Sequence, residues 1–328
     1  MNKKRVLSGI RASGRLHLGN YLGAVKGMLA LQENPEYETF YMVADLHTLT
    51  TPYDPKELKN DVREVVLDYL AAGLDPEKST LFIQSQVPEH VELSYLFATN
   101  VSLARMLHLP TYKEKLKLHP KDSTVALLYY PVLMAADILI YKAESVPTGI
   151  DQEPHLEISR EIARKMNSVY GTDFPEPQRF VTAGEYVPAL TGEGKMSKSV
   201  EGSFINLTDD LPTIKKRLAG APTDSGKGEK IPEKGGVANL LAFVELFEGS
   251  KKKEEYVNAY KGSGIRYSEL KEGLANAIYE ELRPIQERRK KFEDDPDLVE
   301  KILAKGAEKA GEVAKVTLEE TKRKMGLI

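Results

Sequence analysis

The sequence predicts an α/β fold, with a parallel sheet in a first domain and a smaller, mainly helical second domain. Short apolar runs at residues 6–7, 39–43 and 80–83 alternate with segments of helical periodicity, and this order is typical of a parallel sheet. In the last third of the chain the strand patterns stop and the segments become charged and helical. The 328 residues exceed what one core usually serves. We therefore expect two domains, residues 1–204 and residues 205–328.

Helices of the first domain are marked by apolar spacing and by their ends. In the first helix, apolar residues recur every three or four positions at Leu18, Leu22, Val25 and Leu29. In the second, Asp54 can cap the start, Pro55 stands where a missing N–H is harmless, and Glu57 completes a capping box. A short strand near Val146 and a helix over residues 151–170 follow later in this domain.

The most apolar segment, residues 125–141, has nearly the length of a membrane span. It contains Pro131 and Asp137 and is shorter than the roughly twenty apolar residues that a spanning helix needs. We therefore predict a buried core helix and no transmembrane segment. The polar and apolar mixture before it indicates a helical insertion at about residues 88–130.

The second domain is expected to consist of helices around a loop rich in Gly, Pro and Lys at residues 222–236. Pro284 is predicted to end or kink the helix that begins near Arg266. The last helix can pack back on the first domain.

Composition excludes several classes of function. The chain has no cysteine, which excludes disulfides, thiolate metal sites, iron–sulfur clusters and cysteine nucleophiles, and fits a reducing compartment. Its 46 basic and 49 acidic side chains give a net charge of −3, which excludes a histone-like binder. The N-terminus lacks the apolar core of a signal peptide, so we expect a cytoplasmic protein. The four histidines His90, His108, His119 and His155 share no metal-ligand spacing.

A phosphate-binding loop is predicted where the first strand runs directly into the first helix, in the sequence GIRASGRLHLGN at residues 9–20. Backbone N–H groups and the helix dipole point at this end of a strand. Gly14 and Gly19 have the spacing of a P-loop, but Asn20 stands where that motif needs lysine. A P-loop NTPase is therefore disfavoured.

A second phosphate-binding candidate is the sequence KMSKS at residues 195–199, which glycines flank on both sides. Its two ammonium groups and its hydroxyl donors suit the neutralisation of a polyphosphate. A solvated basic loop is the alternative for such a segment.

Asp137 is anomalous because an unpaired carboxylate in an apolar helix costs several kcal/mol (about 2–7). We expect it to need a hydrogen-bond donor. Tyr130, Met134, Asp137 and Tyr141 share one helix face, so a flat ring can lie against Met134 while Asp137 accepts its N–H. The alternative is that Asp137 bonds a neighbouring backbone group.

Two motifs together carry a resemblance. Residues 17–20, His-Leu-Gly-Asn, resemble the HIGH motif of class I aminoacyl-tRNA synthetases, and residues 195–199 are identical to their KMSKS motif. The resemblance covers most of the chain and is closest to the tryptophanyl-tRNA synthetases, with the tyrosyl enzymes as near relatives. It implies a Rossmann-like catalytic domain and a helical anticodon-recognition domain. It also implies a ligase that forms tryptophanyl-adenylate and pyrophosphate from L-tryptophan and ATP, then charges the 3′ end of tRNA(Trp) during protein synthesis.

The resemblance also implies roles for residues. The catalytic residues would be His17, Asn20, Lys195 and Lys198. ATP would be bound by these four and by Arg11, Ala12, Ser13, Gly19, Gly149, Ile150, Asp151, Val187, Met196, Ser197 and Ser199, with Val187 and Met196 offering backbone groups to adenine. Tryptophan would contact Asp137, Tyr130, Met134, Gln152, His47 and Leu7, beside Val146 and Thr148. In this resemblance Asp137 accepts the indole N–H, and Tyr130 and Gln152 hold the ammonium.

Partners follow from the same resemblance. Mg²⁺ would be bound through the ATP phosphates, with no metal held by protein side chains. Relatives act as homodimers through the catalytic domain, with the insertion near residues 88–130 involved, and no membrane or DNA partner is expected. Many bacterial relatives read GEDQ where this chain has Gly149-Ile150-Asp151-Gln152, which leaves the role of Ile150 open.

Other interpretations remain at this point. Tyrosine activation on the same fold is one, although a phenol site usually pairs a tyrosine with an aspartate. An RNA-binding derivative without activity should have lost the motif lysines, and a small-molecule nucleotidyltransferase would lack the helical second domain. The basic residues at 288–291 and the row Lys301, Lys305 and Lys309 either meet tRNA phosphates or form a salt-bridged face.

Overall fold

The computed structural model describes residues 3–118, 124–181, 186–198 and 200–328. Five parallel strands form one sheet in the order β3-β2-β1-β4-β5. The strands are β1 (Lys4–Arg11), β2 (Tyr37–Ala44), β3 (Ser79–Ile83), β4 (Ser145–Pro147) and β5 (Gln178–Phe180). Because the strand order reverses beside β1, the carboxyl ends of β1 and β4 border a crevice, where open α/β sheets bind ligands.

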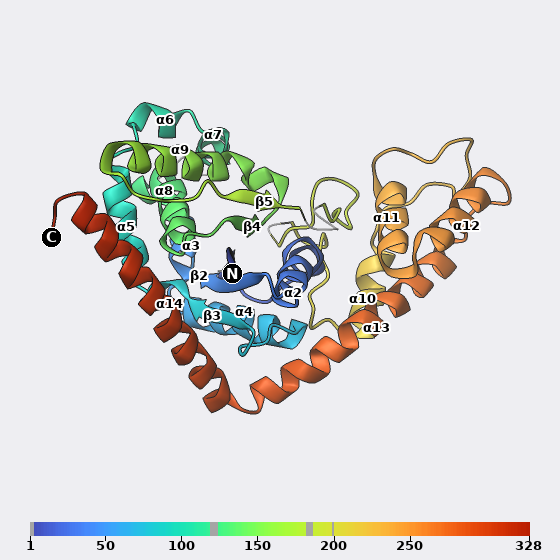
Figure 1. Cartoon of the computed structure of the whole chain (residues 1–328). Helices are drawn as coiled ribbons and strands as arrows, with labels where there is room; N and C mark the ends of the chain where they lie inside the picture. Colours follow the sequence, from blue (N-terminus) through green and yellow to red (C-terminus); the bar gives the residue numbers. More distant parts are fainter. Residues whose placement is uncertain (1–2, 119–123, 182–185, 199) are drawn as a thin grey trace.

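Helices cover both faces of this sheet (Figure 1). Before residue 205 they are α1 (Leu18–Asn20), α2 (Lys26–Gln32), α3 (Asp45–Thr48), α4 (Leu58–Ala72), α5 (Glu89–Ala98), α6 (Leu103–Leu107), α7 (Pro110–Leu118), α8 (Val125–Ile140) and α9 (Glu153–Tyr170). Three shorter turns are η1 (Tyr21–Val25), η2 (Gln84–Gln86) and η3 (Ile150–Gln152). After residue 205 the helices are α10 (Leu211–Ala219), α11 (Gly236–Glu248), α12 (Ser250–Lys261), α13 (Tyr267–Glu293) and α14 (Pro296–Lys324).

The strands alternate between two apolar clusters, one on each face of the sheet. Val6 and Tyr41 belong to the cluster that includes α4 and α13, whereas Leu7 and Phe40 belong to the cluster that includes α5, α8 and α9. Most side chains of α8 are buried in or beside the second cluster, so the predicted core helix is confirmed. Among the residues with described structure, none of the helices combines the length and apolarity needed to cross a membrane.

The last two helices, α13 and α14, form a V, and the sheet domain lies between its two arms (Figure 1). Helix α13 packs on α4 and α10, and α14 runs back along β3, α5 and α8. At Gly306 of α14 a side chain would overlap the carbonyl oxygen of Leu81, so this helix lies directly against β3.

Three details differ from the sequence predictions. Helix α4 begins at Leu58 and not at the predicted cap Asp54, and the side chain at its N-cap, Glu57, makes no capping hydrogen bond. Pro284 was predicted to end or kink a helix, and of these two effects the end is excluded, because helix α13 continues through it. Leu282 and Ile285 on either side are buried, so packing holds the helix. Strand β5 was not predicted, since its three residues, Gln178–Phe180, include only one apolar side chain.

Candidate active site

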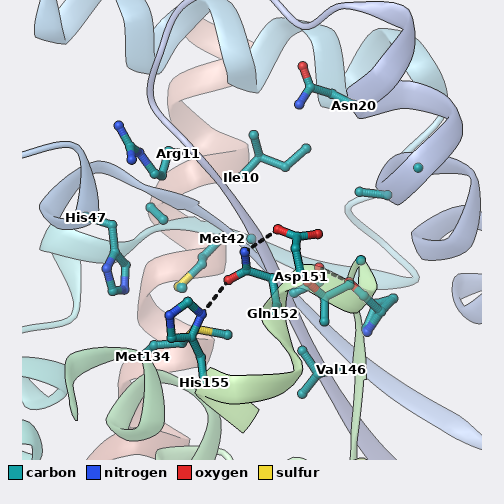
Figure 2. A pocket seen from close by; sticks show the side chains of 18 of the residues that line it. Ile10, Arg11, Asn20, Met42, His47, Met134, Val146, Asp151, Gln152 and His155 are labelled. Carbon is teal, nitrogen blue, oxygen red and sulfur yellow. Dashed lines mark hydrogen bonds between the residues drawn. The ribbon is translucent and has the colours of Figure 1, made fainter. Parts of the chain in front are cut away.

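A cavity of about 920 Å³ opens at the carboxyl ends of β1 and β4 (Figure 2). Its wall combines the loop after β1, the start of α1, one face of α8, the segment after β4 and residues 195–197. This volume is typical of sites for small molecules and cofactors. The sheet therefore brings together segments that lie almost 190 residues apart along the chain.

One end of the cavity is built around His17, at the start of α1. The backbone N–H of His17 donates to Asn20 Oδ1 at 3.2 Å, which fixes both motif residues in one turn. The His17 side chain is buried, and among the described residues its Nδ1 has no hydrogen-bond partner. Burial, together with the charges of Lys198 and Lys195, lowers the pKa of His17 to about 4. The imidazole is therefore neutral at pH 7 and offers a hydrogen bond without a charge.

The low pKa of His17 gives a testable pH dependence. Because its folded pKa lies below the ordinary value of 6.5, the unfolded chain binds a proton first as the pH falls. Stability from this group is full above pH 6.5 and declines towards pH 4, by about 2 kcal/mol at pH 5. Denaturant unfolding at pH 7 and pH 5 should show this loss in the wild type and a smaller loss in His17→Asn. Equal losses in the two proteins would contradict the assignment.

The KMSKS segment lies directly against the start of α1. The N–H of Gly19 points at Met196 Sδ at 3.3 Å, and a side chain at position 19 would collide with the His17 ring. Lys198 Nζ donates to the carbonyl oxygen of Ser13 at 2.7 Å, and Lys195 Nζ lies 3.7 Å from Asp151 Oδ1. The two lysines thus flank the cavity, one at the loop after β1 and one at the segment after β4.

A chain of hydrogen bonds follows the segment after β4 (Figure 2). Gln152 Nε2 donates to Asp151 Oδ2 at 2.7 Å, and Gln152 Oε1 lies 2.9 Å from His155 Nδ1. The other ring nitrogen, His155 Nε2, lies 2.8 Å from the hydroxyl of Tyr130. Burial raises the pKa of Asp151, but Gln152 and Lys195 outweigh it and hold the pKa below its usual value.

Asp137 lies at the other end of the cavity and is fully buried. Its Oδ1 accepts hydrogen bonds from Gln84 Nε2 at 2.8 Å and His90 Nδ1 at 2.6 Å, and its Oδ2 contacts His47 Nε2 at 2.7 Å. Burial raises its pKa, but the bonds from His47 and His90 outweigh this and lower the pKa to about 2. Asp137 thus has the hydrogen-bond donors that we expected it to need. They are three side chains of the protein, and not the neighbouring backbone group that was the alternative.

Most predicted site residues meet in this cavity. Those that line it are Leu7, Arg11, Ser13, His17, Gly19, Asn20, His47, Tyr130, Met134, Asp137, Val146, Thr148, Gly149, Asp151, Gln152, Lys195, Met196 and Ser197. Four others do not line it: Ala12, Ile150, Val187 and Lys198.

The four residues outside the wall have different surroundings. Ala12 and Val187 are buried in the core, while Ile150 is 68% exposed. The backbone groups predicted to face adenine are engaged with each other, since Met196 N donates to the Val187 carbonyl at 2.9 Å. This bond uses one backbone group of each residue, so the expectation that they offer backbone groups to adenine stays a prediction. Ser199 lies outside the described residues.

Sequence reasoning missed several residues of the site. His155, Met42 and Thr50 line the cavity, and Gln84 and His90 hold Asp137 from behind. Thr50, Gln84 and His90 stand in the segments that follow β2 and β3, and polar residues at the carboxyl ends of parallel strands were the signal that could have found them.

The family described as tRNA synthetases class I (W and Y) matches residues 1–283. The chain belongs to this family. Among curated synthetases, the tryptophan–tRNA ligase of Caldanaerobacter subterraneus is 42% identical over 333 residues, covering 99% of each chain. That of Porphyromonas gingivalis is 40% identical over 327 residues, covering 98% of each chain.

Solved synthetase structures agree with the fold. The tryptophanyl-tRNA synthetase of Mycoplasma pneumoniae superposes with a TM-score of 0.87 at 32% identity, covering 100% of this chain and 99% of that one. The Campylobacter jejuni enzyme, complexed with ADP and tryptophane, superposes with a TM-score of 0.83 at 32% identity, covering 98% and 100%. The Rossmann-like fold expected from the synthetase resemblance is confirmed.

The basic residues considered for tRNA contact in this synthetase have varied surroundings. Arg289 is buried against Asp68 and Glu64, so it is not available to a phosphate. Lys305 pairs with Glu77 at 2.9 Å, and Lys309 Nζ lies 3.8 Å from Glu38. For these three residues the salt-bridged alternative is the one observed.

Proposed function

We propose that the chain activates L-tryptophan with ATP and transfers it to the 3′ end of tRNA(Trp) during protein synthesis. The observation that carries this function is the single cavity in which the two class I motif segments meet the buried Asp137 face of α8. Curated relatives with this activity are 40% and 42% identical over nearly the whole chain. The reaction is that of a class I, AMP- and pyrophosphate-forming ligase.

The phosphate end of the cavity would hold ATP. The neutral imidazole of His17 and the amide of Asn20 can donate hydrogen bonds to phosphate oxygens, and Lys195 and Lys198 flank the same space. Arg11, Ser13 and the turn at Gly149 to Asp151 border the adenosine side. We expect Mg²⁺ to be bound through the ATP phosphates.

The Asp137 end would hold tryptophan. An indole ring placed against Met134 brings its N–H to the Asp137 carboxylate, with Leu7, His47, Val146 and Thr148 around the ring. Tyr130 and Gln152 would accept hydrogen bonds from the ammonium group. The carboxylate of the amino acid then points towards the phosphate end.

The reaction needs no protein nucleophile. A carboxylate oxygen of tryptophan attacks the α-phosphorus, a new P–O bond forms, and the bond to pyrophosphate breaks. Charge grows on the phosphate oxygens and on the departing pyrophosphate, where Lys195 and Lys198 stabilise it. In the second step the terminal 2′-hydroxyl of the tRNA attacks the carbonyl carbon and AMP leaves. The protein contributes mainly orientation and electrostatic stabilisation.

Several further properties are part of this proposal. We expect residues 205–328 to recognise the anticodon, and the tRNA acceptor end to approach the cavity. We also expect a homodimer formed through residues 1–204, with the segment near 88–130 involved, and a location in the cytoplasm.

ATP–[³²P]pyrophosphate exchange tests the activation step. Purified protein with Mg²⁺ should exchange label with tryptophan. The specificity constant for phenylalanine should be lower by about 10³-fold, because its smaller ring offers no N–H to the Asp137 carboxylate. Lys195→Ala is the matched inactive control, since it removes a phosphate-facing charge and leaves the Asp137 end intact. Exchange with tyrosine and not with tryptophan would keep the fold and overturn the substrate.

A further inference from the structure

His155 bridges the two residues that the proposed function assigns to the substrate ammonium. Its Nε2 lies 2.8 Å from the Tyr130 hydroxyl, and its Nδ1 lies 2.9 Å from Gln152 Oε1. The imidazole is 2% exposed, is held in the first turns of α9 and meets the Tyr130 ring at 5.2 Å between centroids. A buried histidine that bonds to both of these residues can determine whether each of them donates or accepts a hydrogen bond towards the ligand.

The direction of each hydrogen bond follows from Asp151. A carboxylate only accepts, so the Gln152 group at 2.7 Å from Asp151 is the amide NH₂, and this fixes Gln152 with its oxygen towards His155. The Gln152 oxygen accepts, so His155 Nδ1 carries a hydrogen. In the neutral imidazole Nε2 is then an acceptor, and the Tyr130 hydroxyl donates its only proton to it.

As a result, the Tyr130 oxygen and Gln152 Oε1 both act as hydrogen-bond acceptors towards a ligand. With its proton committed to His155, the Tyr130 oxygen can only accept from any further partner. Gln152 Oε1 also has a second lone pair, and both residues line the cavity. An ammonium group is a donor with no acceptor capacity, so it is the substrate group that fits these two oxygens.

We infer that His155 is a positioning residue for the substrate ammonium, because it orients Tyr130 and Gln152 as hydrogen-bond acceptors. This inference rests on the proposed function. The same series of contacts extends to the KMSKS segment, because Lys195 Nζ lies 3.7 Å from the Asp151 carboxylate. The ammonium site and the KMSKS lysine are therefore joined through Asp151, Gln152 and His155.

The test compares two ligands that differ only at the ammonium: L-tryptophan and indole-3-propionate. The chain contains no tryptophan, so the indole fluorescence of either ligand is read against tyrosine emission alone. We expect His155→Leu to weaken tryptophan binding about 10- to 100-fold and indole-3-propionate binding less than about 3-fold. The KM for tryptophan in exchange should rise while the KM for ATP stays within about 2-fold.

Conservative variants separate positioning from packing. His155→Gln can still accept from Tyr130 and His155→Asn can still donate to Gln152, so each should recover part of the tryptophan affinity that His155→Leu loses. In a Tyr130→Phe background, His155→Gln should cost less than in the wild type. Ser159 lies one turn further along α9, and its hydroxyl donates to the His155 carbonyl. Ser159→Ala is the packing control and should leave the affinities for both ligands unchanged.

Each alternative result has its own meaning. Equal weakening of both ligands by all three His155 variants would overturn the positioning role while the proposed function stands. Wild-type protein that binds indole-3-propionate as tightly as tryptophan would overturn the ammonium site, and with it this inference. Wild-type protein that binds neither ligand would overturn the proposed function itself.

Discussion

Replacing Arg289 by methionine is expected to lower the free energy of unfolding by about 3–5 kcal/mol. Arg289 is 3% exposed and its guanidinium pairs with Asp68 and Glu64, 2.7 Å from Glu64 Oε2. Asp68 is fully buried. If Arg289 is removed, the Asp68 carboxylate loses the guanidinium. Among the described hydrogen bonds to Asp68, the one from the Leu16 N–H at 2.5 Å then remains. Removing one partner of a buried ion pair leaves that charge poorly compensated.

The loss should depend on pH in a defined direction. Burial raises the pKa of Asp68 to about 6 against the opposing effect of Arg289, so Arg289→Met should raise it further. A carboxyl with a raised folded pKa binds its proton more readily when folded, and stability therefore falls as the pH rises through that pKa. The variant should be more destabilised relative to wild type at pH 8 than at pH 5.

Denaturant unfolding with two further variants makes this prediction specific. Arg283→Met on the same helix removes exposed pairs with Glu280 and Glu287 and should cost less than about 0.5 kcal/mol. Adding Asp68→Asn to Arg289→Met removes the stranded charge, keeps an acceptor for Leu16, and should recover much of the loss. Equal effects of Arg283→Met and Arg289→Met would contradict a stabilising role for the buried pair.

Arg289 also illustrates which parts of the fold the sequence could predict. Four of the five strands and the core helix α8 could be predicted from patterns that are local in the chain. The partnership of Arg289 with Asp68 spans 221 residues, and in the sequence this arginine is indistinguishable from its basic neighbours. Packing of α13 on α4 decides its role, and packing also carries that helix through Pro284.

The site divides in the same way. Both motif segments and the Asp137 face could be predicted, because each lies within one short stretch of sequence. The donors to Asp137 could not, since His47, Gln84 and His90 stand 90, 53 and 47 residues from it and come from three different segments. His155 was considered only as a possible metal ligand, because its partner Tyr130 lies on another helix. The sequence indicated where chemistry is concentrated, and tertiary contacts assigned the hydrogen bonds.

Asp137→Asn is expected to lower kcat/KM for tryptophan by about 10²–10³-fold. The wild-type carboxylate has a pKa of about 2, because the bonds from His47 and His90 outweigh burial, so it is an ionised acceptor throughout the working pH range. In asparagine one oxygen becomes an NH₂ group. If the remaining oxygen keeps Gln84 and His90, the NH₂ group replaces Oδ2 and faces the substrate N–H as a second donor.

A substrate analogue shows whether this loss belongs to the ring N–H. In 3-benzothienylalanine, sulfur replaces the indole N–H. The wild type should therefore have a lower kcat/KM for this analogue than for tryptophan, by a factor similar to the loss in Asp137→Asn. The variant should have nearly equal kcat/KM values for the two substrates. Met134→Leu, on the same face of α8, changes the contact with the ring and leaves the carboxylate unchanged. It should lower kcat/KM for both substrates by a similar factor. Pyrophosphate exchange measures all of these constants. If Asp137→Asn keeps full discrimination, then Asp137 serves only His47, Gln84 and His90, and the indole N–H is read by another group.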